Sequence, residues 1–569
     1  MSRATQFGLL LLACAALYLV GNNTVPLWDR DEPRYANASR WMMQSGDWVV
    51  PRIGFGDQPQ TPRTAKPVLI YWLQAGAMGL FGATGFAARF PSAIAMLVTI
   101  VVLFFALGRT RRAFWTVVIF ATSGLTIAAA KMALTDSVLL MFVTISQLCV
   151  YAMWRGRANL FTWIVYGIAV GLAGLTKGPV VLGVNGMTLL VLWGISSLDR
   201  FIISYRQKAL GDSGGVYLPR KARSFTSLRM TNIVVGVCIA LAIIAAICVP
   251  WLLAVQHRAP EFLKTIIGHD VIERVQTGLE GHKGPPGYYL ILIWATYFPW
   301  SLLLPATVVQ AFANRRIPQI RFALAAVIGP WVMFEIVQTK LPHYLLPIFP
   351  PLAFLTGDML IRASRKRIKD MANIAFVRVA FGWAILVALL ASAPWIAIAK
   401  FKFSQAMLWP MVVLSLLGIE WGRQVWLYFR GNKPLDAAAV MGIGMIGLIG
   451  VLYGWYLPTA KYMQISPAVA DILKNQGATR PGDVIMIDYK EPTLAFYQGG
   501  TIQPERDNDY LQNNSPQKWP NWIVTTTEVW HRTPEDLRAK WEVIDQVHGW
   551  SYADGSRILD VLVAKKKDK

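Results

Sequence analysis

Three acids and two arginines stand within the six residues from Asp29 to Arg34, directly after the first hydrophobic segment. Asp31 and Arg34 are three positions apart and share a face if this segment is helical. A carboxylate in that place can deprotonate or orient a hydroxyl group, and a guanidinium can bind phosphate oxygens. The ordinary alternative is that Asp31 caps a helix whose first turn contains Pro33.

A lysine, Lys66, stands directly before Pro67 and a short apolar, aromatic stretch, Val68–Phe81. A lysine at a helix start can bind phosphate together with the free backbone N–H groups there. It can also anchor the helix at a membrane interface, with its ammonium group reaching water. The stretch is too short to cross a bilayer, so we predict an interfacial or re-entrant helix.

Two tight connections between apolar runs hold an acid and a second lysine. Asp136 follows Thr135 at the start of an apolar run, where it either caps the incoming helix or orients a substrate. Lys177 lies in the turn Gly174–Pro179. The glycine and proline are explained by the turn itself, but the lysine needs a partner.

Two later loops add histidines and further charges. Loop 256–287 contains His269 and Asp270, whose side chains permit a metal site, although their spacing matches no zinc pattern. With Tyr288 and His343, these two residues form a candidate substrate pocket. The cations of all these clusters predict one basic pocket, consisting of Arg34, Lys66, Lys177, Arg274 and Lys340. Cations beside lipid indicate an anionic, phosphate-bearing lipid as the ligand.

The composition predicts a polytopic α-helical membrane protein. Of the 569 residues, 55% are hydrophobic and only 15% are charged, which is too apolar for a soluble globular protein. The formal net charge of +23 does not indicate nucleic acid, because the basic residues gather in short loops between apolar runs. The four cysteines lie within apolar runs and show neither disulfide nor metal-ligand spacing.

About thirteen apolar runs are long enough to span a bilayer. They cover residues 6–21, 87–108, 113–131, 137–154, 160–176, 179–195, 232–255, 288–311, 322–338, 343–360, 374–398, 406–422 and 436–456. The first run could be a cleaved signal peptide. However, its conceivable cleavage site, Ala13–Ala15, lies inside the apolar stretch, so we expect a retained anchor.

The basic loops predict the orientation of these spans. If residue 1 is cytoplasmic, every basic loop is cytoplasmic as well, as the positive-inside rule requires. These loops lie at residues 109–112, 155–157, 200–229, 315–321, 362–369 and 423–433. The same parity places all the candidate residues outside, including those of the external loop 22–86.

The tail after residue 456 has a different pattern. Strand-like runs such as Val484–Ile487, Trp522–Thr525 and Ile558–Val563 alternate with helical stretches such as Ala468–Gln476. This alternation predicts a small α/β unit. We therefore expect a transmembrane domain at 1–456 and a soluble external domain at 457–569.

The order of these motifs resembles the bacterial lipid A 4-amino-4-deoxy-L-arabinose transferase family, which belongs with the protein O-mannosyltransferase-like enzymes of the GT-C class. The resemblance covers roughly residues 25–360 and has a family-like external tail. It is specific for the superfamily but not for the sugar or the acceptor. The motifs that carry it are Asp31–Ala36, Ser45–Pro51, Lys66–Trp72, Ala88–Ala93, Thr135-Asp136, Leu175–Pro179 and Lys340–Pro347.

The resemblance implies an inverting glycosyltransferase of the bacterial inner membrane. Its donor would be a monosaccharide on polyprenyl (undecaprenyl) phosphate, and its acceptor lipid A, another glycan or a protein at the periplasmic face. By analogy, Asp31 would be the catalytic carboxylate and Asp136 the second active-site aspartate, while Asp29 and Glu32 would be supporting or structural. Arg34 and Lys66 would bind the lipid phosphate. The residues that would complete the phosphate pocket are Lys177, Arg274 and Lys340.

Two positions depart from the family pattern. The lysine–proline motif is normally preceded by glutamate, where this chain has Ala65, and the family's external Glu-His pair aligns with His269-Asp270. The glutamate and the histidine are the family's candidate metal ligands. Their absence argues against a bound metal and against aminoarabinose as the sugar. We expect no cofactor, with a divalent metal left open.

Two other classes of function compete with a transferase. A transporter or flippase of polyprenyl lipids or glycans often has inverted repeats and ionisable residues within its spans. This chain shows no repeat in its sequence, and its acids crowd the external ends of helices. A scaffold or sensor whose tail binds a partner leaves the clustered cations and aspartates without a function.

Overall fold

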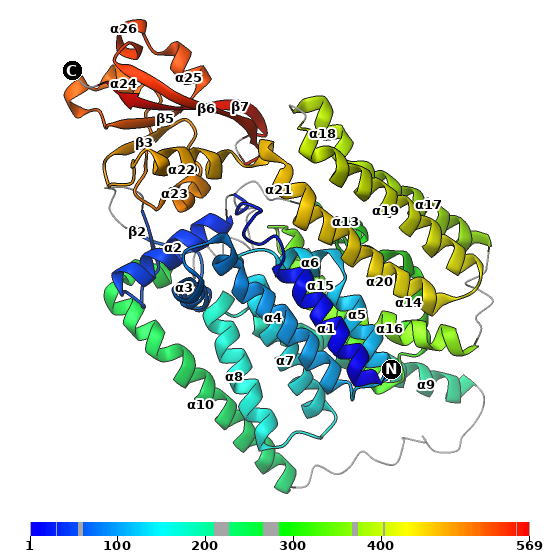
Figure 1. Ribbon diagram of the computed structural model, residues 1–569. Helices are drawn as coiled ribbons and strands as arrows, with labels where there is room; N and C mark the ends of the chain where they lie inside the picture. The colour runs from blue at the N-terminus through cyan, green and yellow to red at the C-terminus, as the bar shows by residue number, and fades with distance from the viewer. Residues whose placement is uncertain are drawn as a thin grey trace.

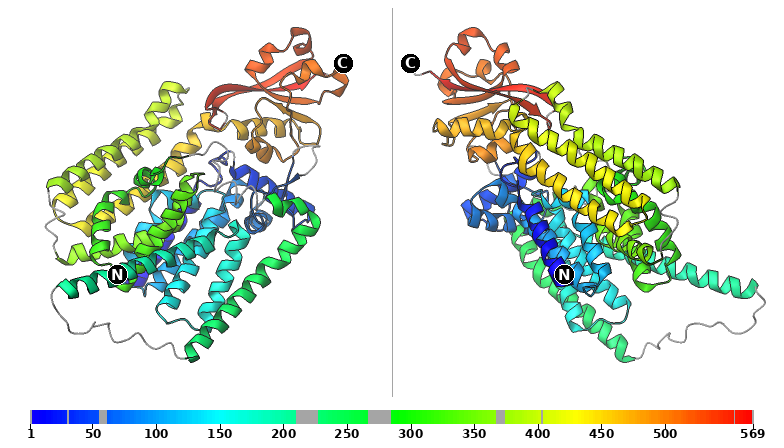
Figure 2. Two further views of the ribbon diagram at one scale, coloured as in Figure 1. Left: turned by 180° about the vertical axis from the view of Figure 1, so that it is seen from behind. Right: turned by 45° about the vertical axis from the view of Figure 1, so that its right-hand side comes forward.

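The computed structural model describes residues 2–29, 31–54, 61–209, 227–265, 284–366, 374–401, 404–553 and 555–567. The candidate residues His269, Asp270 and Arg274 lie outside these ranges. The described chain forms a large helical bundle with a sheet domain packed against one end (Figure 1). The N-terminus lies at the other end of the bundle (Figures 1 and 2).

The first half of the chain supplies most of the helices that surround the site. They are α1 (Arg3–Leu19), α2 (Asp31–Ser45), α3 (Leu69–Phe81), α4 (Gly85–Ala106), α5 (Arg111–Ala121), α6 (Gly124–Ala130), α7 (Asp136–Trp154), α8 (Leu160–Lys177), α9 (Val180–Ala209), α10 (Ser227–Arg258) and α11 (Pro260–Thr265).

The second half adds the remaining helices of the bundle. They are α13 (Tyr288–Thr296), η3 (Trp300–Leu303), α14 (Leu304–Ala313), α15 (Pro318–Ile336), η4 (Pro342–Ile348), α16 (Phe349–Lys366), α17 (Ile374–Ser392), α18 (Pro394–Lys400), α19 (Gln405–Arg430), α20 (Pro434–Val451), η6 (Leu452–Tyr456) and α21 (Leu457–Thr459).

Ten of the described helices are long and apolar enough to cross a membrane, or up to twelve spans if each of two bent pairs counts as one. The bent pairs are α5 with α6, at 67°, and α13 with Trp300–Ala313, at 118°. α1 and α3 are shorter apolar helices. Each predicted span coincides with one of these helices or pairs, the first with α1. The chain is therefore a multi-pass membrane protein.

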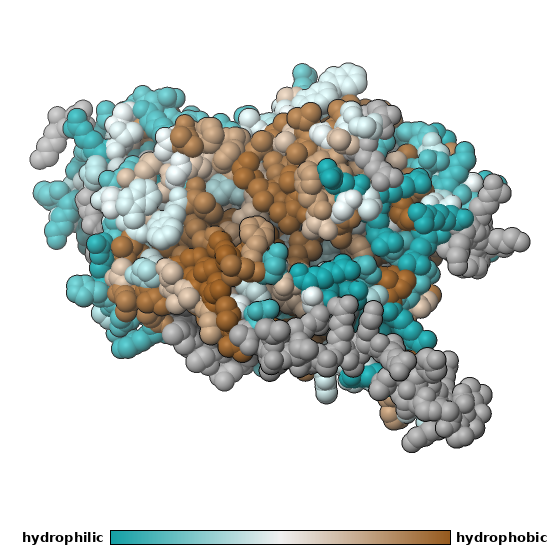
Figure 3. Space-filling model, turned by 90° about the horizontal axis from the view of Figure 1, so that it is seen from below, coloured by the Kyte–Doolittle hydropathy of each residue, from teal (hydrophilic) through white to brown (hydrophobic). Residues whose placement is uncertain are grey.

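The outer helices expose large apolar side chains, whose contact with water would be unfavourable. Leu241 and Leu253 of α10 are 59% and 66% exposed, and Leu389 of α17 is 64% exposed. Seen from below, hydrophobic side chains cover a broad area across the middle of the molecule, with hydrophilic ones towards its borders (Figure 3). Contiguous apolar surface of this kind marks contact with lipid. α16, by contrast, lies in the centre of the bundle.

The two bends meet inside the bundle. The Gly124 N–H at the start of α6 donates to the carbonyl of Phe298 between α13 and η3, at 2.7 Å. The Trp300 indole N–H donates to the Thr122 hydroxyl at 3.1 Å. Because each break supplies partners to the other, backbone groups freed by the bends are satisfied without water.

The C-terminal domain contains a five-stranded mixed sheet, in the order β4-β3-β5-β7-β6. The strands are β3 (Val484–Ile487), β4 (Gln503–Pro504), β5 (Trp522–Thr526), β6 (Trp541–Ser551) and β7 (Arg557–Lys566). β3 pairs in parallel with β4 and β5, whereas β7 pairs antiparallel with β5 and β6. The α/β pattern predicted for the tail is thus confirmed, and the boundary at residues 456 and 457 stays a prediction.

Each face of this sheet packs against helices. Val484 and Met486 of β3 pack in a core with α22 (Ile465–Asn475) and α23 (Pro492–Gln498). Ile485 and Ile487, which point the other way, pack with α25 (Thr527–Arg532). Both faces of β3 are buried, because successive side chains of a strand point to opposite sides. The remaining elements of the domain are η7 (Lys461–Met463), α24 (Tyr510–Asn513), η8 (Pro516–Lys518) and α26 (Glu535–Arg538).

A layer formed by α2 and α3 separates the bundle from the sheet domain. α3, the predicted interfacial helix, is seen nearly end-on in Figure 1, whereas α4, α7 and α8 run along the bundle. α2 packs against α3 on one side and α23 on the other. A short hairpin, β1 (Arg52–Ile53) with β2 (Thr61–Pro62), joins this layer. The layer presents the first acidic cluster between the two parts of the molecule.

Candidate active site

A buried ion pair fixes the start of α2. Arg89 of α4 binds Glu32 through two hydrogen bonds, from Nε to Oε1 at 3.0 Å and from Nη2 to Oε2 at 2.7 Å, and both side chains are almost completely buried. The Arg89 guanidinium also donates to the carbonyls of Asn22, Val25 and Pro26. Such a bidentate pair with its remaining donors satisfied holds one geometry. The loop before α2 is therefore wrapped around Arg89.

The other contacts of Glu32 connect this loop to the entrance of α7. Its Oε2 accepts from the Trp28 N–H at 2.6 Å, and its Oε1 from the Ala133 N–H at 2.5 Å. Ala133 lies in the connection between α6 and α7, which ends at Asp136. Glu32 is thus a structural residue, and it sets Asp31 and Asp136 at the same end of the bundle.

Asp31 and Arg34 line a cavity of about 820 Å³, here called the polar cavity. Asp31 is the first residue of α2 and is exposed, and Arg34 is half-buried one turn further on. The α6 and α7 region and the start of η4 form the rest of the wall, which includes Asp136 and His343. Ala553 of the C-terminal domain also contributes. The predicted pairing of Asp31 and Arg34 on one helix face therefore matches their place in the structure.

A second cavity of about 280 Å³, here called the lysine pocket, contains Lys66 and Lys177. Most of its other walls are apolar and include Leu139, Leu140 and Phe334. Asp136 and His343 line this pocket as well as the polar cavity. These two residues therefore stand at the boundary between a polar space and a space with cations at one end and apolar side chains at the other.

Asp136 is the centre of the charged groups at this boundary. Its Oδ1 lies 2.5 Å from the Lys177 Nζ, and its Oδ2 lies 3.8 Å from the His343 Nε2. Lys66 also interacts electrostatically with Asp136, and Asp31 interacts electrostatically with His343. The ammonium group of Lys177 lies 4.8 Å from the centre of the Tyr344 ring. Five of the predicted residues thus form a single electrostatic group.

Lys340 and Tyr288 are not among the residues that line either cavity. Lys340 is buried, and its Nζ donates to the carbonyls of Phe334, at 3.2 Å, and Glu335. These carbonyls belong to the last turn of α15, where a lysine satisfies otherwise unpaired acceptors. In this structure Lys340 therefore caps α15, because the turn after Ile336 directs it back, and its role as a phosphate ligand stays a prediction. Tyr288 packs edge-on against Tyr289.

Arg63 is a cation near Asp31 that we did not predict from the sequence. Arg63 lies over the Tyr35 ring, with its guanidinium carbon 4.9 Å from the ring centre, and it interacts electrostatically with Asp31. Tyr35 itself lies 5.6 Å from Tyr71 of α3, centre to centre. The available signal was its position three residues before Lys66 in the same loop.

The C-terminal domain holds the loop that leads into α2. The backbone N–H of Thr493 donates to Asp29 Oδ1 at 3.2 Å, and the Thr493 hydroxyl donates to the same oxygen. The Tyr552 hydroxyl accepts from the Asp29 N–H, and its ring lies edge-on to Trp28. Burial, together with the charge of Glu491, raises the pKa of Asp29 to about 8. This acid therefore belongs to an interdomain contact.

Helix α2 makes further contacts with the same domain. The Arg40 guanidinium donates to the Phe496 carbonyl at 2.9 Å, and the Asn37 amide donates to the Pro492 carbonyl at 3.1 Å. Both acceptors lie in α23. Within the described ranges, no cluster of three or more His, Cys, Asp or Glu side chains is arranged to hold a metal ion.

Comparison with known proteins identifies relatives of the chain. The family described as dolichyl-phosphate-mannose-protein mannosyltransferase matches residues 5–266. The undecaprenyl phosphate-alpha-4-amino-4-deoxy-L-arabinose arabinosyl transferase 2 of Proteus mirabilis is 30% identical over 400 residues, which cover 68% of this chain and 66% of the relative. The corresponding transferase of Pseudomonas aeruginosa is 30% identical over 375 residues, or 64% of this chain and 61% of the relative.

The match spans less than two thirds of the length of these curated relatives, 66% of the first and 61% of the second. A solved structure shares the fold over nearly the whole length: the crystal structure of ArnT from Cupriavidus metallidurans bound to undecaprenyl phosphate. It superposes with a TM-score of 0.70 at 21% sequence identity, and the match covers 98% of each chain.

Proposed function

This chain belongs to the protein-mannosyltransferase-like family of GT-C membrane glycosyltransferases that includes the arabinosyl transferases named above, and from that premise we propose its donor, acceptor and active site. The donor is a monosaccharide on a polyprenyl phosphate, and the acceptor is an envelope molecule such as lipid A, another glycan or a protein. The observation that carries this proposal is the pair of cavities that meet at Asp136 and His343.

The lysine pocket fits the donor. Lys66 and Lys177 supply two positive charges to the pocket, and its apolar side chains suit isoprene units. Lysine binds phosphate as a compact point charge. When the donor binds, its phosphate shares the Lys177 ammonium with Asp136, so the buried aspartate keeps that lysine in place before the substrate arrives.

The polar cavity fits the acceptor. The acceptor hydroxyl gives its proton to Asp31 while its oxygen forms a bond to the anomeric carbon of the donor sugar. The bond from that carbon to the phosphate oxygen breaks, and its electron pair stays on the polyprenyl phosphate. Fixed cations stabilise the phosphate charge as it develops. Because attacking and leaving oxygens occupy different cavities on either side of the sugar, the configuration inverts.

The choice of sugar depends on the wall beside Lys66. Ala65 lines the lysine pocket at the position where the resembled family has glutamate. A methyl group leaves more room there and removes an acid that could pair with an amino sugar. We therefore propose a sugar other than aminoarabinose as the preferred donor group.

The orientation of the molecule follows from its charges. The N-terminus and the basic loops at 109–112 and 423–433 lie at one end of the bundle, and the sheet domain lies at the other (Figure 1). The positive-inside rule assigns the basic end to the cytoplasm. We propose that the protein resides in the bacterial inner membrane, with both cavities and the 457–569 domain on the periplasmic side.

Reconstitution tests the function directly. Protein in lipid nanodiscs is supplied with undecaprenyl phosphate-linked sugars and with an envelope lipid extract, and mass spectrometry follows both the acceptor and the released undecaprenyl phosphate. The proposal expects both products to form together. Movement of intact donor lipid across proteoliposomes without any transfer would favour a flippase and contradict it.

A further inference from the structure

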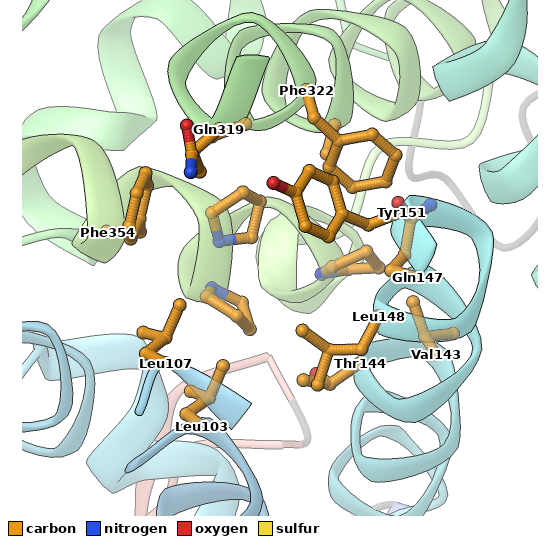
Figure 4. A pocket seen from close by; sticks show the side chains of 15 residues that line it. Leu103, Leu107, Val143, Thr144, Gln147, Leu148, Tyr151, Gln319, Phe322 and Phe354 are labelled. Atoms are coloured by element: carbon orange, nitrogen blue, oxygen red, sulfur yellow. The ribbon is translucent and has the colours of Figure 1, made fainter. Parts of the chain in front are cut away.

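A third cavity lies deeper in the bundle, between α4, α7, α15 and α16, and it is not used by the reaction described above. Figure 4 shows side chains from all four helices pointing into a common space. Its volume is about 110 Å³. Leu103, Leu148, Phe322 and Phe354 form its walls, together with Pro350. We call it the deep pocket.

The deep pocket continues the lysine pocket. Pro347 lines both of them. On α7, Leu139 and Leu140 line the lysine pocket, and Val143 lines the deep pocket less than one turn further on. Two apolar spaces that share a wall residue and adjoin on the same helices offer one path for a flexible chain.

The path leads far from the phosphate end. Gln147 at the deep pocket lies eleven positions beyond Asp136 on α7. At about 1.5 Å per residue this is a depth of roughly 16 Å. The hydrocarbon core of a bilayer is about 30 Å thick. The deep pocket therefore lies beyond the reach of the sugar and phosphate, and within reach of a long lipid chain held at the lysine pocket.

One of the polar side chains around the deep pocket, Gln147, points its donors elsewhere. The Gln147 amide donates to Asn185 and Thr188 of α9, both at 3.0 Å. The prolines contribute backbone without N–H groups. An apolar cavity of about 150 Å³ in another protein stays dry and binds benzene. The deep pocket thus has the chemistry and the size for one branched five-carbon unit.

From this continuity we propose that the deep pocket binds a distal isoprene unit of the donor chain and so selects for long polyprenyl donors. The inference rests on the function proposed above. It predicts that a short-chain donor, such as a farnesyl phosphate-linked sugar, reaches the lysine pocket but not the deep pocket.

The test fills the deep pocket with a larger side chain at Leu148, a half-buried residue of its wall. Leu148→Trp adds bulk inside it, and Ile145→Trp adds the same bulk to the same helix at a residue that lines none of the cavities described. Leu148→Trp is expected to raise the KM of the undecaprenyl donor about tenfold, because apolar burial is lost. Its kcat, and kcat/KM for the farnesyl donor, stay unchanged. Ile145→Trp is expected to leave the KM and the kcat unchanged for both donors.

An equal loss with both donors, or no loss with either, would overturn the proposal. The short-chain donor serves as the control for folding, because a misfolded variant loses both activities. Wild-type protein that transfers sugar from neither donor contradicts the proposed function instead. In that case, native mass spectrometry of lipid binding still tests the deep-pocket proposal. Leu148→Trp should weaken the binding of undecaprenyl phosphate and leave the binding of farnesyl phosphate unchanged.

Discussion

Asp31 and Asp136 differ in their surroundings, and this difference divides their roles. Asp31 is exposed to the polar cavity at the start of a helix. Asp136 is buried and lies against Lys177 and His343. A carboxylate that faces a solvated cavity can accept a proton from an incoming hydroxyl, whereas one held by a lysine is suited to fixing that lysine. We therefore propose that Asp31 transfers the proton and that Asp136 orients Lys177.

The Glu32→Gln substitution tests the buried ion pair. It leaves the Arg89 guanidinium buried beside a neutral amide, and breaking a buried pair from one side costs about 3–5 kcal/mol. The melting temperature of the purified protein should fall clearly. Glu420→Gln is the matched control, because its hydrogen-bonded pair with Arg423 is exposed and should contribute nothing measurable. Equal melting temperatures for the two variants would contradict the structural role of Glu32.

Much of the candidate site was predictable from residue types, because each charge stood at the end of an apolar run. Asp31, Lys66, Asp136, Lys177 and His343 were all expected on one side of the membrane, and the structure gathers them around two cavities. Lys340 shows the limit of such reasoning. The contacts of its side chain depend on the direction of a turn that apolar periodicity does not determine. Its role as a phosphate ligand, like the roles of the other candidate residues, stays a prediction.

At the scale of elements, α23 and the end of β6 act as a clamp on the segment that leads into α2. Thr493, in the first turn of α23, bonds Asp29, and Tyr552 contacts both Asp29 and Trp28. Asp29 and Trp28 line the polar cavity beside Asp31. We propose that the sheet domain positions Asp31 through these contacts.

Thr493→Val tests this clamp. The variant keeps the shape of the side chain but removes its hydroxyl donor to the buried Asp29 carboxyl, at a cost of about 1–3 kcal/mol. We expect kcat for sugar transfer to fall several-fold while the KM for the donor stays unchanged, because the lysine pocket is not touched. Thr493→Ser restores the donor and should restore kcat. A rise in donor KM with constant kcat would contradict a positioning role.

The pH dependence of stability gives a second test of the clamp. Burial and the charge of Glu491 raise the pKa of Asp29 to about 8, above its ordinary value of 3.8. Between these values the folded state binds a proton that the unfolded state has released, so this contribution to stability falls as pH rises through the interval. Asp29→Asn removes the dependence. Melting temperatures from pH 5 to 8 should therefore decline more steeply in wild type, and parallel curves would contradict the assignment.

The membrane-spanning helices were predictable because the length of each apolar run locates them. The bends within them depend on tertiary contacts and were not predicted. Apolar length located every span, because crossing a bilayer requires about twenty apolar residues. Apolar length gave no signal for the bends within 113–131 and 288–311, although Ser123-Gly124 and Pro299 stand where the helices break. The bends arise from contacts between distant segments, namely Gly124 with Phe298 and Thr122 with Trp300.

At the scale of the whole molecule, the positively charged loops and the polar cavity lie at opposite ends of the bundle. The described basic loops at 109–112 and 423–433 lie at the end of the bundle with the N-terminus, and the polar cavity lies under the sheet domain (Figures 1 and 2). This arrangement yields a prediction that does not depend on catalysis.

Cysteine labelling tests the orientation. Lys518→Cys places an exposed thiol in the sheet domain, and Lys433→Cys places one in a basic loop at the other end. A membrane-impermeant maleimide added to intact spheroplasts should label the first and not the second, with the wild-type protein as background. Permeabilisation should then expose both sites. The reverse pattern would place the cavities in the cytoplasm and contradict the proposed orientation.

The most direct measurement of the central claim is the transfer rate of Asp31→Asn in nanodiscs with an undecaprenyl phosphate-linked donor. Asp545→Asn, an exposed position in the sheet domain, is the matched control. If Asp31 takes the acceptor proton, its variant should lose about 10²- to 10⁴-fold in kcat while still binding undecaprenyl phosphate, because the lysine pocket is intact. Transfer by Asp31→Asn at the rate of Asp545→Asn would contradict the account.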